Sequence, residues 1–361
     1  MVNGNRMVAA DVHASASWLV GLEVATGELW RRRVVGSPGR VLEVVCALGS
    51  GTRLLYEAGP CGFWLARAGA ERGVAIEVCA PGSVPRAPGD RVKTDRRDAE
   101  RLLRLWRAGE LSMARIPTAV EEAFRDLVRA REDARGDLMR HRHRLGKFLL
   151  RRELRCQVAK PWTQKWMAWA AGLEFDDACA RATFVDYLAA VQAAIARRDA
   201  LDRALEQAWP TCPWAPVITR LRCFRGVDTL SACGLAAEIG DFVRFEHPKR
   251  LAGFLGIVPR EHSSGERRHQ GAITKAGPTH ARRLLVEAAH HYRHPPAVGT
   301  KLSRRQHGQD PRAIAIAWRA QQRLHRRYRH LSIDRGKPDN VTTVALAREL
   351  ATFIWEAATV T

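Results

Sequence analysis

The hydrophobic period of the first 80 residues changes in a definite order, which restricts the folds open to the chain. Alternating apolar and small residues are typical of strands, whereas apolar residues three and four apart are typical of helices. The pattern predicts a strand hairpin at 7–25, a strand at 28–35, a helix at 40–48, a strand at 52–59, a helix at 63–72 and a strand at 74–81. These elements together predict an α/β domain with a mixed sheet.

The order of these elements also matches a ribonuclease H-like core, which we expect within residues 1–115. Residues 120–153 and 184–209 are long, charge-laced stretches with little Gly or Pro, and they predict two long helices. Two such helices suggest an antiparallel or an intermolecular coiled coil. We therefore expect a helical dimerisation region over residues 116–212.

A proline-rich stretch and a group of tryptophans mark the middle of the chain. Trp162, Trp166 and Trp169 are four and three residues apart, which places their rings on one helical face. Core or dimer packing explains this spacing better than base stacking does. The segment PTCPWAP, 210–216, reads as a hinge, and it opens a mainly helical last domain that we place at 213–361.

The charge of the chain indicates a polyanionic partner. A formal net charge of +21, spread along the sequence, favours nucleic acid over an anionic membrane surface, because neutralised phosphates release counterions. No signal segment and no apolar run of about 18 residues is present. The eight cysteines form no CxxC pair and read as core thiols. We expect a soluble, cytoplasmic protein without a membrane partner.

Four carboxylates stand in unusual settings. Asp11 and Glu57 lie in apolar strand patterns, where an unpaired charge is costly to bury, and Asp95 and Asp98 are one helical turn apart. Such a cluster could hold one or two hard cations for phosphoryl chemistry. Taken alone, however, Asp95 could also be a helix N-cap, with Asp98 completing an acidic first turn that suits the helix dipole.

The flanking basic residues are candidate phosphate contacts, and the C-terminal half offers two further candidates. Lys93, Arg96 and Arg97 surround the aspartate pair. The turn at 225–228 contains Gly226 and resembles a helix-hairpin-helix, whose backbone N–H groups could bind phosphate, although such turns are also common in purely structural roles.

A serine-containing loop follows that turn. Ser263 and Ser264 lie among cationic residues, which would stabilise a serine nucleophile attacking a phosphodiester. The simpler interpretation is a loop that only contacts phosphate. The cationic residues assigned to nucleic-acid binding here are Arg260, Arg267, Arg268 and Lys275.

These motifs together resemble a known family. AADVH, YEAGP and KTDRRDA occur in order and are followed by LAGFLGIVPREHSSG and GAITKAGPTHARRLLVEAA. The set is similar to the DEDD-type transposases of the IS110 family, and the segment SSGERRHQGAITKAG resembles the IS1111 subgroup. The resemblance extends from about residue 7 to residue 300.

The resemblance implies a RuvC-like first domain whose DEDD tetrad binds divalent metal, Mg2+ or Mn2+. By position the tetrad is Asp11, Glu57, Asp95 and Asp98, and the nucleophile that attacks DNA covalently is Ser263 or Ser264. It also implies a non-coding guide RNA that pairs with donor and target DNA, and homodimers that assemble into a tetramer through the long helices. A protein so guided needs backbone contacts more than base readout, which suits the diffuse charge.

Two alternatives and two unmatched segments remain. The chain could be a metal-dependent RuvC-like nuclease or Holliday-junction resolvase, or a basic architectural protein that is not an enzyme. Residues 301–331 form a basic helical extension that we expect to contact RNA or DNA. We expect the final helix, 340–357, to pack on the catalytic domain because its apolar positions recur at helical spacing.

Overall fold

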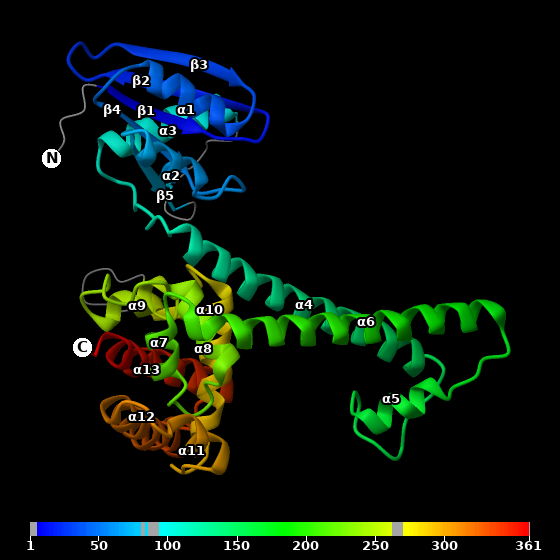
Figure 1. Ribbon diagram of the computed structural model, residues 1–361. Coiled ribbons are helices and arrows are strands. Elements are labelled where there is room, and N and C mark those ends of the chain that lie inside the picture. The colour runs from blue at the N-terminus through cyan, green and yellow to red at the C-terminus, as the bar shows by residue number, and fades with distance from the viewer. Residues whose placement is uncertain (1–5, 81–83, 86–93, 262–269, 361) are drawn as a thin grey trace. The chain divides into compact units, whose positions relative to one another are not determined.

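The computed structural model describes residues 6–80, 84–85, 94–261 and 270–360. Its chain forms two compact units, residues 1–119 and 120–361, which are taken separately below (Figure 1). Within the described residues, no helix is long and apolar enough to cross a membrane.

The first unit contains a five-stranded mixed sheet of order β3-β2-β1-β4-β5. The antiparallel pairs are β1–β2 and β2–β3, and the parallel pairs are β1–β4 and β4–β5. This order fits a ribonuclease H-like domain, as the sequence predicts. The elements are β1 Arg6–Asp11, β2 Ala16–Glu23, β3 Leu29–Val35, α1 Pro38–Ala47, β4 Thr52–Glu57, α2 Trp64–Glu71, β5 Ala75–Cys79 and α3 Asp95–Arg107.

The sheet is covered on both faces, and the strand alternation decides which side chain faces which helix. Val8 and Tyr56 belong to a core cluster with residues of α1 and α2. Ala9 follows Val8 in β1 and Leu55 precedes Tyr56 in β4, so both point to the other face of the sheet. They belong to a second core cluster with Leu102 and other residues of α3. Side chains two residues beyond Ala9 and Leu55 therefore also face α3.

Helix α3 begins at the acidic pair that the sequence singled out. The Thr94 hydroxyl accepts a hydrogen bond from the Arg97 backbone N–H at 3.4 Å, so Thr94 is the N-cap. Asp95 is therefore the first residue of the helix and not its cap, which corrects one reading of the sequence. Asp98 lies in the acidic first turn, as expected, and suits the helix dipole.

The second unit begins with a long helical hairpin. α4 (Ala119–Leu150) and α6 (Ala178–Ala208) lie side by side (Figure 1). Arg131 near the start of α4 pairs with Asp202 near the end of α6 at 2.6 Å, and Asp137 pairs with Arg197 at 2.8 Å. The two helices therefore run antiparallel within one chain, which is the first of the two predicted arrangements.

The far end of this hairpin has its own small core around α5 (Gln164–Ala171). Trp166 is only 5% exposed and packs with Phe148 and Phe184 in one cluster. Its ring centroid lies 4.3 Å from that of Trp162 and 5.7 Å from that of Trp169. The structure thus confirms core packing as the role of this aromatic group.

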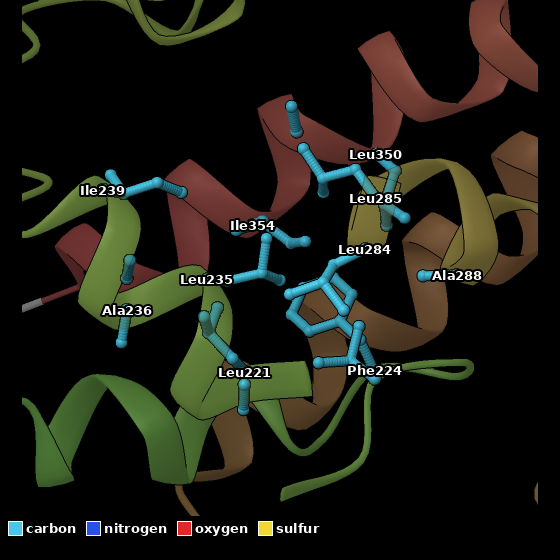
Figure 2. Close-up of a cluster of buried hydrophobic side chains, with 14 of the residues drawn as sticks. Leu221, Phe224, Leu235, Ala236, Ile239, Leu284, Leu285, Ala288, Leu350 and Ile354 are labelled. Atoms are coloured by element: carbon cyan, nitrogen blue, oxygen red, sulfur yellow. The ribbon is translucent and has the colours of Figure 1, made fainter. Parts of the chain in front are cut away.

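The rest of the second unit is a mainly helical core (Figure 2). Leu235 of α8 (Thr229–Ile239), Leu285 of α10 (Thr279–Ala289) and Leu350 and Ile354 of α13 (Asp339–Thr359) meet in its centre. The expectation that the final helix packs on the catalytic domain is therefore wrong, because the apolar side of α13 is buried against α9 (Pro248–Phe254), α10 and α12 (Pro311–Arg329) of its own unit.

Several short elements complete this unit, among them a small antiparallel hairpin of two strands, β6 and β7. The basic extension forms two helices, α11 and α12. The remaining bounds are η2 Trp209–Thr211, α7 Ala215–Leu221, α8 Thr229–Ile239, α9 Pro248–Phe254, β6 Pro259–Glu261, β7 Gln270–Ile273, α10 Thr279–Ala289, η3 His290–Arg293, α11 Thr300–Gln306, α12 Pro311–Arg329, η4 His330–Asp334 and α13 Asp339–Thr359.

Candidate metal centre

A cavity of about 270 Å³ lies at one edge of the sheet in the first unit, and all four carboxylates of interest line it. Asp11 and Glu57 are the last residues of the neighbouring parallel strands β1 and β4, and both face α3. Parallel strands end at the same sheet edge, so these two side chains arrive together. Helix α3 starts at this edge and adds Asp95 and Asp98.

Three ligand-type side chains in this cavity converge closely. Asp11 Oδ2 lies 3.3 Å from His13 Nε2, and His13 Nε2 lies 3.8 Å from Asp95 Oδ1. One ligand atom from each of the three residues lies within 4.8 Å of the others. Carboxylate oxygens and an imidazole nitrogen suit a divalent cation such as Mn2+, and the carboxylates alone suit Mg2+. The donor set therefore fits a metal of the kind that the resemblance implies.

The other two carboxylates line the same cavity in different surroundings. Asp98 Oδ1 accepts a hydrogen bond from Arg101 Nη1 at 3.1 Å, and both side chains are mostly buried. Glu57 lies opposite Cys79 in the sheet register. Burial, and then the Glu57 charge, raises the pKa of the Cys79 thiol to about 12, so this thiol stays protonated beside the carboxylates.

The electrostatics of Asp11 show that the cavity gathers negative charge. Burial is the largest cause that raises the pKa of Asp11, and the nearby Asp95 and Asp98 raise it further. The neighbouring His13 opposes these effects but does not cancel them. A cation held among these oxygens would offset both the desolvation and the repulsion.

His13 is the one member of the cluster that sequence reasoning missed. The residue stands in the motif AADVH, two positions after Asp11 and just beyond the end of β1. Only carboxylates were considered as ligands, although His is a common ligand of transition metals. The i, i+2 spacing of Asp and His at a strand end was the available signal.

The structure describes four of the cationic residues that the sequence assigns to nucleic-acid binding, Arg96, Arg97, Arg260 and Lys275. Arg96 and Arg97 are exposed in the first turn of α3, where Arg96 also lies 3.6 Å from Glu100. Arg260 in β6 and Lys275 after β7 are both exposed. Ser263, Ser264, Lys93, Arg267 and Arg268 lie outside the described residues.

Gly226 has a packing role that the sequence did not reveal. Its φ of +80° favours glycine, and a Cβ atom there would lie 2.7 Å from the carbonyl oxygen of Ala288 in α10. The start of α8 is capped by Asp228, whose carboxylate accepts a hydrogen bond from the Ser231 N–H at 2.8 Å. Helix packing thus accounts for the glycine, and its contact with phosphate stays a prediction.

Comparison with known proteins gives the family. Residues 218–301 match the model of the transposase IS116/IS110/IS902 family. A putative transposase of Sinorhizobium fredii is 42% identical over 84% of this chain and 74% of its own length. The transposase for insertion sequence element IS1533 of Leptospira borgpetersenii is 34% identical over 78% of this chain and 82% of its own.

The family match and these two relatives define the class of the protein as a transposase, a DNA-processing enzyme. The chain belongs to the IS116/IS110/IS902 family of transposases, enzymes that cut and transfer DNA strands. The transposase for IS1111A of Coxiella burnetii is 37% identical over 70 residues, 19% of each chain. So short a match does not confirm the IS1111 subgroup, which stays a prediction.

Proposed function

We propose that this transposase excises and inserts its element at a metal centre formed by Asp11, Glu57, Asp95 and Asp98. The observation that carries the proposal is the single cavity that these four carboxylates line at the carboxyl edge of β1 and β4. Burial and the neighbouring Asp95 and Asp98 raise the pKa of Asp11, so its ionised form is costly there, and a bound cation would offset that cost.

The ions expected in this cavity are Mg2+ or Mn2+, which would supply charge stabilisation to a reacting phosphodiester. The chain's own residues have separate tasks. The carboxylates hold the cation, and His13 either adds a ligand or fixes the orientation of Asp11 through their 3.3 Å contact. Arg96 and Arg97, exposed on α3, are placed to bind neighbouring phosphates.

We further propose that Ser263 or Ser264 is the nucleophile, a role supported by the family resemblance and by their cationic sequence surroundings. In this step a bond forms between the serine oxygen and phosphorus, and the bond to one DNA oxygen breaks. The serine proton leaves to a base, and the departing DNA strand ends in a hydroxyl. The product is a protein–DNA phosphodiester that a second strand can later attack.

The partners proposed for this reaction are donor and target DNA and a non-coding guide RNA. The family resemblance also supports homodimers that join into a tetramer. The exposed long hairpin of α4 and α6 offers an extended surface for such assembly.

The carboxylate assignment is tested by recombination assays on Asp11→Asn, Glu57→Gln and Asp98→Asn proteins with cognate RNA and DNA. We expect recombination to fall by at least roughly a thousandfold while DNA affinity changes less than twofold, because the loss affects transition-state stabilisation. Glu71→Gln, an exposed acid at the end of α2, is the matched control. Full activity of Asp98→Asn would overturn the tetrad.

The serine assignment is tested by looking for a protein–DNA adduct that survives denaturation. The adduct should form in wild type and disappear in one of the two variants, Ser263→Ala or Ser264→Ala. Strands with free 5′-phosphate ends and no adduct in wild type would instead favour hydrolysis, the reaction of a RuvC-like nuclease or Holliday-junction resolvase.

A further inference from the structure

A second cavity, of about 510 Å³, lies in the first unit between α3 and the β2–β3 hairpin. One wall comes from α3 and the other from the β2–β3 hairpin, and arginine is the most frequent residue type in the lining. It is lined by Val20, Leu22, Gly27, Leu29, Arg31, Arg97, Glu100, Arg101, Leu103, Arg104 and Arg107. We call it the α3 groove.

The arginines of the α3 groove form a stripe along one helix. Arg97, Arg101 and Arg104 stand at positions i, i+4 and i+7 of α3, which lie on one helical face. Opposite them, Arg31 of β3 pairs in register with Val20, whose side chain belongs to the core cluster on the α3 side of the sheet. Both walls therefore point cationic groups into the same groove.

At the end of this groove farthest from Asp98, the positive charge of Arg104 and Arg107 is not neutralised by the described residues around it. Glu100 is the single acidic residue of the lining and is shared, since it pairs with Arg31 at 2.5 Å and with Arg96 at 3.6 Å. Across the described part of the chain, no carboxylate lies within ion-pair distance of Arg104 or Arg107. Like charges at i, i+3 and i, i+4 repel one another, so this stripe weakens the bare helix. An anionic ligand would remove that cost.

The groove is continuous with the candidate metal centre. Arg101 lines both cavities, and its guanidinium holds Asp98. From there the groove follows α3 to Arg107 and Gly27, and Gly27 lies in the turn of β2–β3 at the opposite end of the sheet from Asp11. The ten residue steps from Arg97 to Arg107 span about 15 Å of helix. This length matches about four phosphates of one strand.

The floor of the groove is apolar. Val20, Leu22 and Leu103 are almost fully buried, whereas Leu29 is 53% exposed at the rim. A strand whose phosphates face the arginines can place sugar and base surfaces over such a floor. The volume is that of a small-molecule pocket, so the groove can enclose one or two bases of a strand while about four of its phosphates follow the arginines of α3.

We propose that the α3 groove binds a single strand of DNA and leads it to the carboxylate cavity. The inference rests on the proposed function, because continuity with a site that cuts DNA selects DNA as the occupant over RNA. It adds Arg31, Arg104 and Arg107 to the phosphate contacts, none of which stands in a recognised motif of the chain.

The test uses the full-length chain with Arg104→Ala and Arg107→Ala combined. Both arginines are exposed and neither lines the carboxylate cavity. The matched control combines Arg32→Ala and Arg72→Ala, two exposed arginines on the α1 and α2 side of the same unit. Binding of a short single-stranded DNA oligonucleotide is followed by fluorescence anisotropy in EDTA over a series of salt concentrations, with circular dichroism as a check of folding.

We expect the groove variant to bind about tenfold more weakly at physiological salt and its salt slope to fall by about 1.4, since each single-strand phosphate contact contributes roughly 0.7. The control should change less than twofold. Equal affinity of groove variant, control and wild type would overturn the proposal. The proposal would also be overturned if the groove variant lost affinity only for an RNA strand of the same sequence and kept its affinity for the DNA strand.

Because these measurements are made in EDTA, they are independent of cleavage. A weakened groove variant together with an active Asp98→Asn protein would leave the groove intact and reject the tetrad. A groove variant that binds DNA normally, together with an inactive Asp98→Asn protein, would reject the groove and support the tetrad. If Arg107→Ala at the end of the helix destabilises the fold, Arg104→Ala alone should still weaken binding about threefold, because one of two equal contacts is lost.

Discussion

Oδ2 of Asp11 lies 3.3 Å from Nε2 of His13, and yet burial and the two neighbouring aspartates still raise the pKa of Asp11. A carboxyl whose pKa is raised by folding is destabilising when ionised, so its charge costs stability at every pH above that raised value. The cost disappears below the unfolded pKa of about 4, where both states are protonated.

Asp11→Asn should therefore raise the melting temperature in EDTA at neutral pH by a few degrees, because the neutral amide has no charge to bury or to be repelled. The gain should vanish when the pH is lowered through 4. Added Mn2+ should stabilise wild type and not the variant. Differential scanning calorimetry of both proteins, with Glu71→Gln as control, measures this. Equal stabilisation of both proteins by Mn2+ would contradict a role for Asp11 as ligand.

Glu238 of α8 stabilises the second unit through α4 and α10. Its side chain is 5% exposed, accepts two hydrogen bonds from Arg129 at 3.0 and 3.1 Å, and lies 3.5 Å from His280 Nδ1. Burial alone would raise the pKa of Glu238, but His280 and Arg129 outweigh it and lower the pKa to about 2. This stability is present above the unfolded pKa near 4.5 and is lost as the pH falls towards 2.

Glu238→Gln should reduce the free energy of unfolding at neutral pH by about 2 kcal/mol, because it removes the carboxylate that pairs with Arg129. The loss is moderate because the Arg129 side chain is about half exposed and so partly hydrated. Denaturant titrations at several pH values should show the difference from wild type closing between pH 4.5 and 2. The control is Glu287→Gln, a 57% exposed partner of Arg283, which should cost less than about 0.5 kcal/mol. A difference independent of pH would contradict the charge account.

Gly226→Ala should destabilise the second unit by about 2 kcal/mol or more, because a methyl group would meet the Ala288 carbonyl and the positive φ disfavours it. Thermal unfolding measures the loss. Gly253→Ala is the control, since a Cβ there meets nothing within 4 Å and alanine suits a helix. A variant that melts like wild type but binds DNA poorly would restore the phosphate-binding interpretation of this turn.

Much of the fold follows from local patterns. The succession of strands and helices in the first unit and its mixed sheet are as predicted, because both follow from the hydrophobic period along the chain. The predicted start of α6, Phe184, lies six residues after the observed start, Ala178. The missed signal is the N-cap Asp177, which accepts a hydrogen bond from the Ala180 N–H at 2.7 Å.

The sequence by itself determined the chemistry of the parts: the positive charge, the apolar strands that end in Asp11 and Glu57, and the acidic first turn of α3. Only the tertiary structure decided which of these side chains and helices contact one another. It joined His13 to Asp11 and Asp95, ran α4 and α6 antiparallel, and buried α13 in the second unit. Local periodicity sets which face of an element is apolar, whereas its partner depends on packing between residues far apart in the chain.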